Sequence, residues 1–504
     1  MSEIVGAKRV AKNTMIMYIR MLVLVCISFY TSRKLLYLLG VEDYGIYSVV
    51  GSISSTFVAL KGIFTEAIQR FLNFAKGKDN LNEEQQIFSI AVRVHIILAL
   101  LVVFIVEIVG MWLIYEKLVI PTEKISTAVF VFQMTIISSV FSILNIPYES
   151  VIIANERMNV YSYLSIFDGF FRLAVIFIIQ VLPFELLRSF SLLIVFTPIN
   201  SLIISFFYCK RFPECRLIKT TDKKLIKDIF SLSGWNFFGN ISFSILHEGI
   251  NFILNAFGGL VYNTARGVAY QVKTIALQFS NNTVISARPM IMQNAAKRGD
   301  DALTYDIIEM SRISFFILLL PVFPLVTYCE ELLDFWLVDV PPYASLFTKW
   351  VLIGVLIRSL HEPLNMLYMA KASIKRMMII EMIVMLSTIT IIYLLLSNGQ
   401  DMWVAFVVLA IMELIIVLSL LTNAKTELGF SIKLYIKHVI IPLFVILVGL
   451  FLFYLLLRFI LLPDTIFLAI LYAMVSVLIV SLFVILGMNE KEKSLVISFF
   501  KSKK

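Results

Sequence analysis

The stretch AKGKD at residues 75–79 returns as AKRGD at residues 296–300, in the second half of a 504-residue chain. Other residues keep the same order in both halves. The matched pairs are Tyr44 and Tyr262, Thr65 and Thr283, Arg70 and Arg288, Arg93 and Arg312, Pro147 and Pro363, and Ala154 and Ala370. Single matches are common in a biased composition, but matches that stay in order across a whole half indicate an internal repeat.

The composition is that of an integral membrane protein. Hydrophobic residues make up 60% of the chain and charged residues only 15%, which is far from the balance of a soluble domain. About 14 apolar stretches reach the roughly 17–25 residues that a helix needs to cross a bilayer. Their expected bounds are 14–38, 45–66, 86–112, 125–147, 160–182, 189–208, 231–257, 264–287, 306–328, 345–369, 377–397, 402–422, 437–460 and 465–487. The expected fold class is therefore all-α.

The repeat divides these helices into two pseudo-symmetric six-helix bundles followed by two C-terminal helices. We expect the first bundle at 1–208, a basic cytoplasmic linker at 209–230, the second bundle at 231–422, and two apolar helices with a cytoplasmic tail at 423–504. The last two helices have no charged residue at 439–457 or 466–486, so we expect them outside the bundles, facing lipid or an acyl chain. Two related halves in a membrane are typical of an alternating-access transporter with its site between the halves.

The placement of basic residues predicts the orientation. Of the 43 Lys and Arg residues, only Lys117, Lys124 and Arg188 fall in expected outer loops, and most lie in short inner segments. Because excess Lys and Arg marks the cytoplasmic side of a membrane protein, both termini are expected in the cytoplasm. Contact of the basic loops with anionic lipid head groups accounts for the net charge of +9 without a nucleic-acid partner. The basic linker is expected to be a solvated loop at the membrane surface.

Polar residues recur at three- and four-residue steps on single faces of three expected helices. The seventh carries Asn236, Asn240, Ser244, His247, Glu248, Asn251 and Asn255; the eighth carries Arg266, Tyr270, Lys273 and Asn281; the tenth carries Arg358, His361, Glu362 and Asn365. Ionisable residues at membrane depth cost about 2.5–3.5 kcal/mol each, so these faces are expected to meet water, substrate or one another. The alternative is that ion pairs such as Glu248 with Lys273, or Arg358 with Glu362, only fix the packing of helices.

The expected cavity is mainly cationic, because deep basic residues outnumber deep carboxylates. Such a cavity suits an anionic head group, since phosphate oxygens pair well with guanidinium and ammonium donors. The adjacent pairs His247–Glu248 and His361–Glu362 are candidates for proton coupling. The four cysteines lack the spacing of metal ligands, and no GxxxxGK[ST] loop is present to bind ATP. We therefore expect no metal, no cofactor and no ATP.

Several segments resemble a known family. They are KNTMIMYIRM (12–21), FYTSRKLLYLLGVEDYGIYSVVG (29–51), QRFLNFAKGK (69–78), SGWNFFGNI (233–241) and NTARGVAYQV (263–272). Together they resemble the polysaccharide-transporter, O-antigen-type flippase branch of the MOP superfamily, which also contains the multidrug and toxin extrusion (MATE) transporters. The resemblance covers essentially the whole chain. It implies a MATE-like fold, with two six-helix bundles facing a central cavity.

The resemblance also implies a function and a site. Such proteins move an undecaprenyl-pyrophosphate-linked oligosaccharide across the bacterial inner membrane for O-antigen, capsule or exopolysaccharide assembly. For this protein we expect alternating access, with energy from a coupling ion such as H⁺ or Na⁺ or from the membrane potential. Family members that flip pyrophosphate lipids keep basic residues in the first, second and eighth helices. In this sequence Arg20, Lys61, Arg266 and Lys273 occupy comparable places. With the residues of the polar faces added, the candidate substrate-binding residues are Arg20, Lys61, Arg266, Lys273, Arg358, Asn240, Asn251, Asn255 and Tyr270, and the ion-coupling candidates are His247, Glu248, His361 and Glu362.

Two rival functions remain open. A multidrug or cation antiporter of the same fold would present carboxylates in the first bundle, where the first two helices hold only Glu66, at an expected cytoplasmic end. A membrane-embedded polymerase or ligase acting on the same lipid-linked glycan needs a platform outside the membrane. The longest expected outer loop, 329–344, contains no His. A transporter rather than an enzyme is therefore the favoured interpretation.

Overall fold

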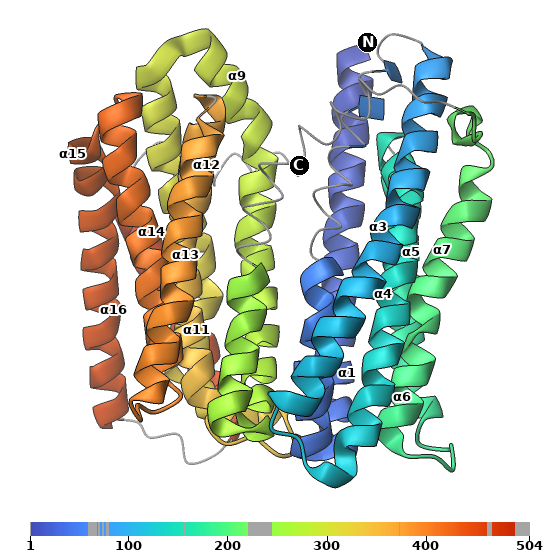
Figure 1. Ribbon diagram of the computed structural model, residues 1–504. Helices are drawn as coiled ribbons and strands as arrows, with labels where there is room; N and C mark the ends of the chain where they lie inside the picture. Colours follow the sequence, from blue (N-terminus) through green and yellow to red (C-terminus); the bar gives the residue numbers. More distant parts are fainter. Residues whose placement is uncertain are drawn as a thin grey trace. The chain divides into compact units, whose positions relative to one another are not determined.

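The computed structural model describes residues 2–58, 68, 71–72, 75–76, 80–155, 157–219, 244–371, 373–460 and 466–488, which form helices and turns without a strand among them (Figure 1). The expected all-α class is thus confirmed. The chain divides into two compact units, unit 1 from Met1 to Thr264 and unit 2 from Ala265 to Lys504. Unit 1 includes the helical residues 244–258, and the expected division into two six-helix bundles stays a prediction.

Unit 1 begins with a long helix that a glycine interrupts. Its elements are α1 (Ser2–Val58), α3 (Leu81–Glu116), η1 (Thr122–Lys124), α4 (Ile125–Ala154), α5 (Met158–Ile178), α6 (Leu186–Ile194), α7 (Phe196–Cys209), η2 (Pro213–Cys215), the helical residues 244–258 and the start of α9 (Leu260–Thr327). Gly40 has φ 73° and ψ 177° inside α1, a conformation that suits a residue without Cβ. Helix α1 therefore consists of two helices, as the separate expected spans on either side of Gly40 require.

Helix α4 lies at the centre of unit 1 and packs against α1, α3, α5, α6 and α7 (Figure 1). Its residues Ile146, Val151 and Ile152 form a buried core with Phe88 of α3. Helices α3 and α4 approach closely at Gly110, where an added Cβ would lie 2.0 Å from the Phe132 ring. The absence of a side chain at this position lets the two helices pack closely.

Helix α3 shows how local sequence and the membrane act together. Asn80 caps it, because its side-chain oxygen accepts the N–H of Glu83 at 3.2 Å, and such a cap satisfies one of the free donors at a helix start. Farther along, Ile97, Leu100 and Phe104 are 65–68% exposed. Exposed apolar residues of this size are expected on a surface that faces lipid rather than water.

Unit 2 is arranged around α14. Its remaining elements are α10 (Cys329–Trp336), α11 (Ala344–Arg358), α12 (His361–Ala370), α13 (Ile374–Ser397), α14 (Val404–Leu428), α15 (Ile432–Tyr435), the π-helical turn η3 (Ile436–Ile440), α16 (Ile441–Ile460) and α17 (Ile466–Gly487). Helices α11, α12 and α13 all pack against α14. Tyr368 of α12 strengthens this packing, because its hydroxyl donates to the backbone oxygen of Leu420 at 2.8 Å.

Pro363 separates α11 from α12. A proline inside a helix has no N–H to donate and its ring clashes with the carbonyl four residues earlier, which here belongs to Ser359. The helix stops at Arg358 and restarts at His361. In unit 1 the repeat-related Pro147 lies inside α4, which continues across it. The expected tenth span agrees with the candidate membrane span Ala344–Ala370, which is interrupted at residues 359–360.

Arg312 of α9 holds the turn before α16 and the end of α17 to the rest of unit 2. Its guanidinium donates to the backbone oxygen of His438 at 2.7 Å and to that of Gly487 at 2.5 Å. Gly487 ends α17, so Arg312 supplies a partner for one of the carbonyls that a helix end leaves unpaired. Large parts of both helices stay exposed, with Phe444 at 65% and Leu478 at 69%, and their expected position outside the bundles stays a prediction.

Ten helices among the described residues are long and apolar enough to cross a membrane, and the chain is a multi-pass membrane protein. The number falls below the expected 14 for identifiable reasons. The stretch Leu22–Ser52 counts once across the break in α1, the expected span 264–287 lies within the long α9, and Leu471–Gly487 is a shorter apolar helix. Part of the seventh expected span, 231–243, lies outside the described residues.

The described start of the basic linker makes contacts with other parts of unit 1, and its expected role as a solvated cytoplasmic loop stays a prediction. Glu214 of η2 is buried, and its Oε1 lies 2.9 Å from Nζ of Lys76 and accepts a hydrogen bond from Nδ2 of Asn155 at 2.8 Å. Arg93 of α3 donates to the backbone oxygen of Ile218 at 2.7 Å. These contacts anchor Glu214 and Ile218, while Arg211, Arg216 and Lys219 of the same segment are exposed.

Burial acts against the charged form of Glu214. The hydrogen bonds from Lys76 and Asn155 outweigh that penalty and lower the pKa of Glu214 below its ordinary value. Residues 220–230 of the basic linker lie outside the described residues.

Candidate functional site

Charged side chains gather inside the apolar helices of unit 2. Arg358, the last residue of α11, places Nη1 3.1 Å from Oε1 and 3.4 Å from Oε2 of Glu413 in α14. The two side chains are only 16% and 7% exposed. Nη2 of Arg358 lies 3.9 Å from Oε1 of Glu362. The guanidinium therefore lies between two carboxylates at membrane depth.

His361 forms a second contact of this kind. Its Nε2 lies 2.8 Å from Oε1 of Glu381 in α13, and the two side chains are 2% and 14% exposed. Its other ring nitrogen, Nδ1, is 3.9 Å from Oε1 of Glu362. His361 is the first residue of α12, after the break before Pro363. Its ring lies between the carboxylates of Glu362 in α12 and Glu381 in α13.

Three residues at one-turn steps on α9 add positive charge and an aromatic ring. The guanidinium of Arg266 lies 4.0 Å and Nζ of Lys273 lies 4.7 Å from the centroid of the Tyr270 ring, distances at which a cation is attracted to the face of the ring. Lys273 also interacts electrostatically with Glu413 and Arg358. We define the Arg358 cluster as Arg266, Tyr270, Lys273, Arg358, His361, Glu362, Glu381 and Glu413.

The structure changes the expected charge balance of the site. Sequence reasoning brought Arg266, Lys273 and Arg358 together as cations and identified Glu362, but it missed Glu381 and Glu413. The signal was present, because each of these is a carboxylate inside an otherwise apolar span, where a charge needs a partner. The Arg358 cluster thus contains three basic residues, three carboxylates and one histidine, so it is not the mainly cationic site that was expected.

The predicted basic residues of unit 1 are described only in part. Arg20 of α1 lies over the Tyr161 ring of α5, with its guanidinium carbon 4.7 Å from the centroid. Lys61 and Asn240 lie outside the described residues. A role for these three residues in substrate binding stays a prediction.

Asn251 and Asn255 lie in a buried amide network. The amide Nδ2 of Asn263 donates to Oδ1 of Asn251 at 2.7 Å, and Nδ2 of Asn255 donates to Oδ1 of Asn263 at 2.9 Å. Asn251 also donates to the backbone oxygen of Ser48 at 3.2 Å, and Oδ1 of Asn255 accepts the N–H of Val119 at 2.7 Å. All three asparagines are fully buried. In this state the network joins α1, the helical residues 244–258 and α9, and a ligand would have to break it to bind there.

The other ion-coupling candidates lie in the same helical segment of unit 1. His247 is 8% exposed and Glu248 is partly exposed. Their role, like that of His361 and Glu362 in ion coupling, stays a prediction.

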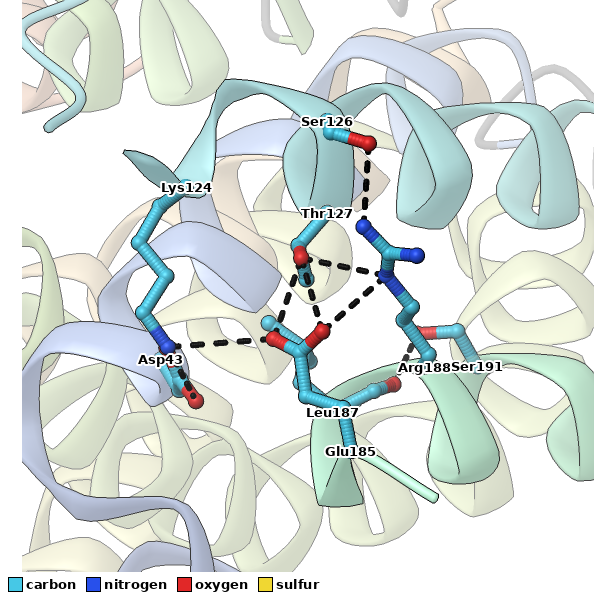
Figure 2. Close-up of polar contacts among 8 residues, drawn as sticks. All are labelled: Asp43, Lys124, Ser126, Thr127, Glu185, Leu187, Arg188 and Ser191. Atoms are coloured by element: carbon cyan, nitrogen blue, oxygen red, sulfur yellow. Dashed lines mark hydrogen bonds and ion pairs between the residues drawn. The ribbon is translucent and has the colours of Figure 1, made fainter. Parts of the chain in front are cut away.

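A second group of charges joins three helices of unit 1 and contains two of the three basic residues expected outside (Figure 2). Nζ of Lys124 lies 2.9 Å from Oδ1 of Asp43 and 3.7 Å from Oε1 of Glu185. Nε of Arg188 lies 3.0 Å from Oε2 of Glu185. The same carboxylate also accepts a hydrogen bond from the hydroxyl of Thr127. These pairs tie α1 to the starts of α4 and α6, so we assign them a structural role.

Comparison with known proteins gives likenesses at the level of structure. No protein-family model and no curated protein matches this sequence. A structure of the lipid II flippase MurJ in an inward closed conformation matches 95% of this chain and 99% of its own, with a TM-score of 0.67 and 15% identity. An inward-facing multidrug resistance MATE family transporter of the MOP superfamily matches 80% of this chain and 94% of its own, with a TM-score of 0.63 and 10% identity.

A third likeness is to a MOP superfamily transporter from Pyrococcus furiosus, with a TM-score of 0.55 and 10% identity over 83% of this chain and 96% of the other. All three structures match most of both chains. The chain therefore has the all-helical membrane fold that the lipid II flippase MurJ shares with the MATE transporters of the MOP superfamily.

Proposed function

We propose that this protein translocates a polyprenyl-pyrophosphate-linked oligosaccharide, such as the undecaprenyl-linked precursor of O-antigen, capsule or exopolysaccharide, across the bacterial inner membrane by alternating access. The observation that carries the proposal is the Arg358 cluster, in which Arg266, Lys273 and Arg358 lie close together inside a membrane-spanning unit. Buried basic residues are costly in a membrane, and a pyrophosphate group is a ligand that would repay such a cost. The fold supports the proposal, since it is also the fold of a lipid II flippase.

In this proposal each kind of residue has a separate task. Arg358 and Arg266 would bind phosphate oxygens through their planar, permanently charged guanidinium groups, and Lys273 would add a compact positive charge. Tyr270 would hold the two α9 cations in place and offer a face and a hydroxyl to the first sugar. The polyprenyl tail would remain in the lipid. A coupling ion such as H⁺ would use His361 and Glu381, the shortest histidine–carboxylate contact of the cluster.

The test is the location of the lipid-linked oligosaccharide when the gene is deleted in its native host. An external glycan-modifying enzyme, applied before and after permeabilisation of the inner membrane, reports the leaflet. We expect a protected intermediate facing the cytoplasm, which the intact gene clears and the Arg358→Ala variant does not. Single repeat units on the outer leaflet would point to a polymerase instead, and absence of any intermediate would exclude the glycolipid function.

A multidrug or cation antiporter is the second candidate, and the carboxylates favour it. Glu381 and Glu413 give unit 2 anionic groups that a lipophilic cation could use, and MATE transporters share the fold. The two functions are separated by transport of a fluorescent cationic dye into inverted membrane vesicles. Energy-dependent dye uptake that Glu381→Gln or Glu413→Gln abolishes would favour the antiporter, whereas the flippase proposal expects no such uptake.

A further inference from the structure

The pairing of Arg358 is close but not ideal. Both oxygens of Glu413 approach the same nitrogen, Nη1, at 3.1 and 3.4 Å, and Glu362 is 3.9 Å from Nη2. A strong arginine–carboxylate pair instead forms two parallel hydrogen bonds, one from each of two guanidinium nitrogens. Glu413 therefore neutralises Arg358 without the bidentate geometry that would make the pair difficult to separate.

The position of Glu413 is the one that a ligand anion would need. Arg358 and Lys273 both act on this carboxylate, and it is only 7% exposed. A pyrophosphate carries more negative charge and more acceptor oxygens than a carboxylate, so it competes well for both cations. It cannot do so while the charged carboxylate stays in place, because like charges at this distance repel.

A displaced carboxylate cannot remain charged without a partner. An isolated carboxylate in an apolar interior is so unfavourable that the group binds a proton instead. We infer that Glu413 is a resident counter-ion: the pyrophosphate group of an entering ligand takes its place on Arg358, and the released carboxyl group takes up one proton from the aqueous phase. This inference rests on the proposed function, and it identifies the step that links anion binding to proton uptake.

The surroundings of Glu413 fit this exchange. Helices α11, α12, α13 and α15 pack against α14. To the Arg358 cluster they contribute Arg358, His361, Glu362 and Glu381. Helix α9 contributes Lys273, which interacts with Glu413, and Arg266, which interacts with Lys273. Glu381 is engaged with His361 at 2.8 Å, which leaves Glu413 as the most buried carboxylate held by Arg358. The other charged residues on these helices are toward their ends: Lys349, Lys371, Lys375, Arg376, Lys425, Glu427 and Lys433. Glu427, for example, is about 21 Å along the α14 axis from Glu413.

The test is calorimetric titration of the purified full-length protein with farnesyl pyrophosphate and, separately, inorganic pyrophosphate, in two buffers of different ionisation enthalpy. The difference between the buffers measures the protons taken up on binding. For the wild type we expect uptake of about one proton and an affinity that falls about tenfold per unit rise in pH where the coupling is complete. For Glu413→Gln, which is neutral at every pH, we expect at least tenfold tighter binding at pH 8 and about one proton less taken up.

Two further variants serve as controls. Glu330→Gln removes a carboxylate that also pairs with a lysine, Lys349 at 2.8 Å, but that is 66% exposed, and we expect wild-type binding and proton uptake. Glu413→Asp keeps the charge and should keep the proton uptake. If Glu413→Gln does not fold, Glu413→Ala, which is also neutral at every pH, takes its place as the test variant. Protonation of the probe itself is common to all variants and cancels in the comparison.

The outcomes separate the inference from the proposed function. Failure of the wild type to bind either probe would overturn the proposed function. Binding without proton uptake by the wild type, or equal uptake by Glu413→Gln, would overturn the counter-ion exchange alone. Tighter binding of farnesyl pyrophosphate identifies a lipid head group as the ligand, and equal binding of both probes identifies a free anion; the exchange holds in both cases.

Discussion

At the scale of single residues, the contact between Arg358 and Glu413 has two consequences. A buried ion pair adds little net stability, because removing both charges from water costs about as much as their attraction returns. Removing one partner is different, since it leaves the other charge buried without compensation. The pair is therefore better explained by a need for charge at this position than by stability.

Substitution of the pair separates folding from function. Arg358→Ala should lower the free energy of unfolding by about 3–5 kcal/mol because Glu413 loses its buried partner. The double variant Arg358→Ala/Glu413→Ala should recover most of this loss but should still fail to transport. Thermal unfolding in detergent measures the first effect and the leaflet assay measures the second.

A surface pair provides the control. Arg376 and Glu427 also form an ion pair, but their side chains are 52% and 40% exposed. Arg376→Ala should change the free energy of unfolding by about 0–1 kcal/mol.

Restored transport activity in the Arg358→Ala/Glu413→Ala double variant would contradict a role for Arg358 in binding the anion.

Glu214 predicts a pH dependence of stability. Lys76 and Asn155 lower the pKa of Glu214 in the folded protein. The charged form of Glu214 therefore stabilises the fold above the ordinary carboxyl pKa of 4.5. This contribution is lost as the pH falls through the lowered pKa. The Glu214→Gln variant should be less stable than the wild type at neutral pH by about 1.5–3 kcal/mol, and the difference should shrink below pH 4.5. Thermal unfolding across this range tests it, with Glu123→Gln, an exposed carboxylate in η1, as control. A constant difference down to pH 3 would contradict it.

At the scale of helices, close packing of α3 on α4 depends on a missing side chain. Gly110→Ala would place a Cβ 2.0 Å from the Phe132 ring, and that ring is fully buried and has no room to move. We expect a loss of about 1–3 kcal/mol from overpacking. Gly51→Ala is the matched control, because nothing lies within 4 Å of its added Cβ and alanine favours a helix by about 1 kcal/mol over glycine. Equal unfolding temperatures for the two variants would show that the helices can separate at Gly110.

The two prolines of the repeat show how related helices acquire different functions. Arg358 and His361 lie five and two residues before Pro363. The residues at the same distances before Pro147 are Ser142 and Asn145. Unit 1 thus carries uncharged residues where unit 2 carries the basic part of its cluster. The helix break before Pro363, which α4 lacks at Pro147, accompanies this change.

At the scale of the molecule, one contact occurs in both units. Arg93 donates to the backbone of Ile218, 125 residues later, and Arg312 donates to that of His438, 126 residues later. The two arginines are a matched pair of the internal repeat, and both acceptors follow the last helix of their own bundle as expected from the sequence. This agreement in contact, and not only in residue type, supports the repeat.

The orientation of the chain gives the last prediction. On a background without native cysteines, Lys117→Cys should react with a membrane-impermeant maleimide in intact cells, and Lys375→Cys should react only after permeabilisation. The reason is that Lys117 is one of the few basic residues expected outside, whereas Lys375 belongs to an expected inner segment; both are exposed. The reverse pattern of labelling would invert the proposed orientation.

Much of the fold could be predicted from the sequence. Long apolar runs can only be helices in a membrane, because every backbone N–H and C=O there must be paired within the chain. The positions of most spans, including 125–147 and 402–422, therefore follow from local composition and agree with α4 and α14. The polar faces of the eighth and tenth spans also followed from periodicity, and Arg266, Lys273 and Arg358 do share one cluster.

The sequence alone thus determined the membrane class, the helices and the faces that carry charge, since these depend on residues close together in the chain. Only the tertiary structure decided the partners. It paired Arg358 with Glu413 rather than mainly with Glu362, joined His361 to Glu381, and buried Asn251 and Asn255 in a network of their own. Helical periodicity specifies the direction in which a side chain points, but the residue that it meets lies on another helix, and long-range packing alone brings the two together.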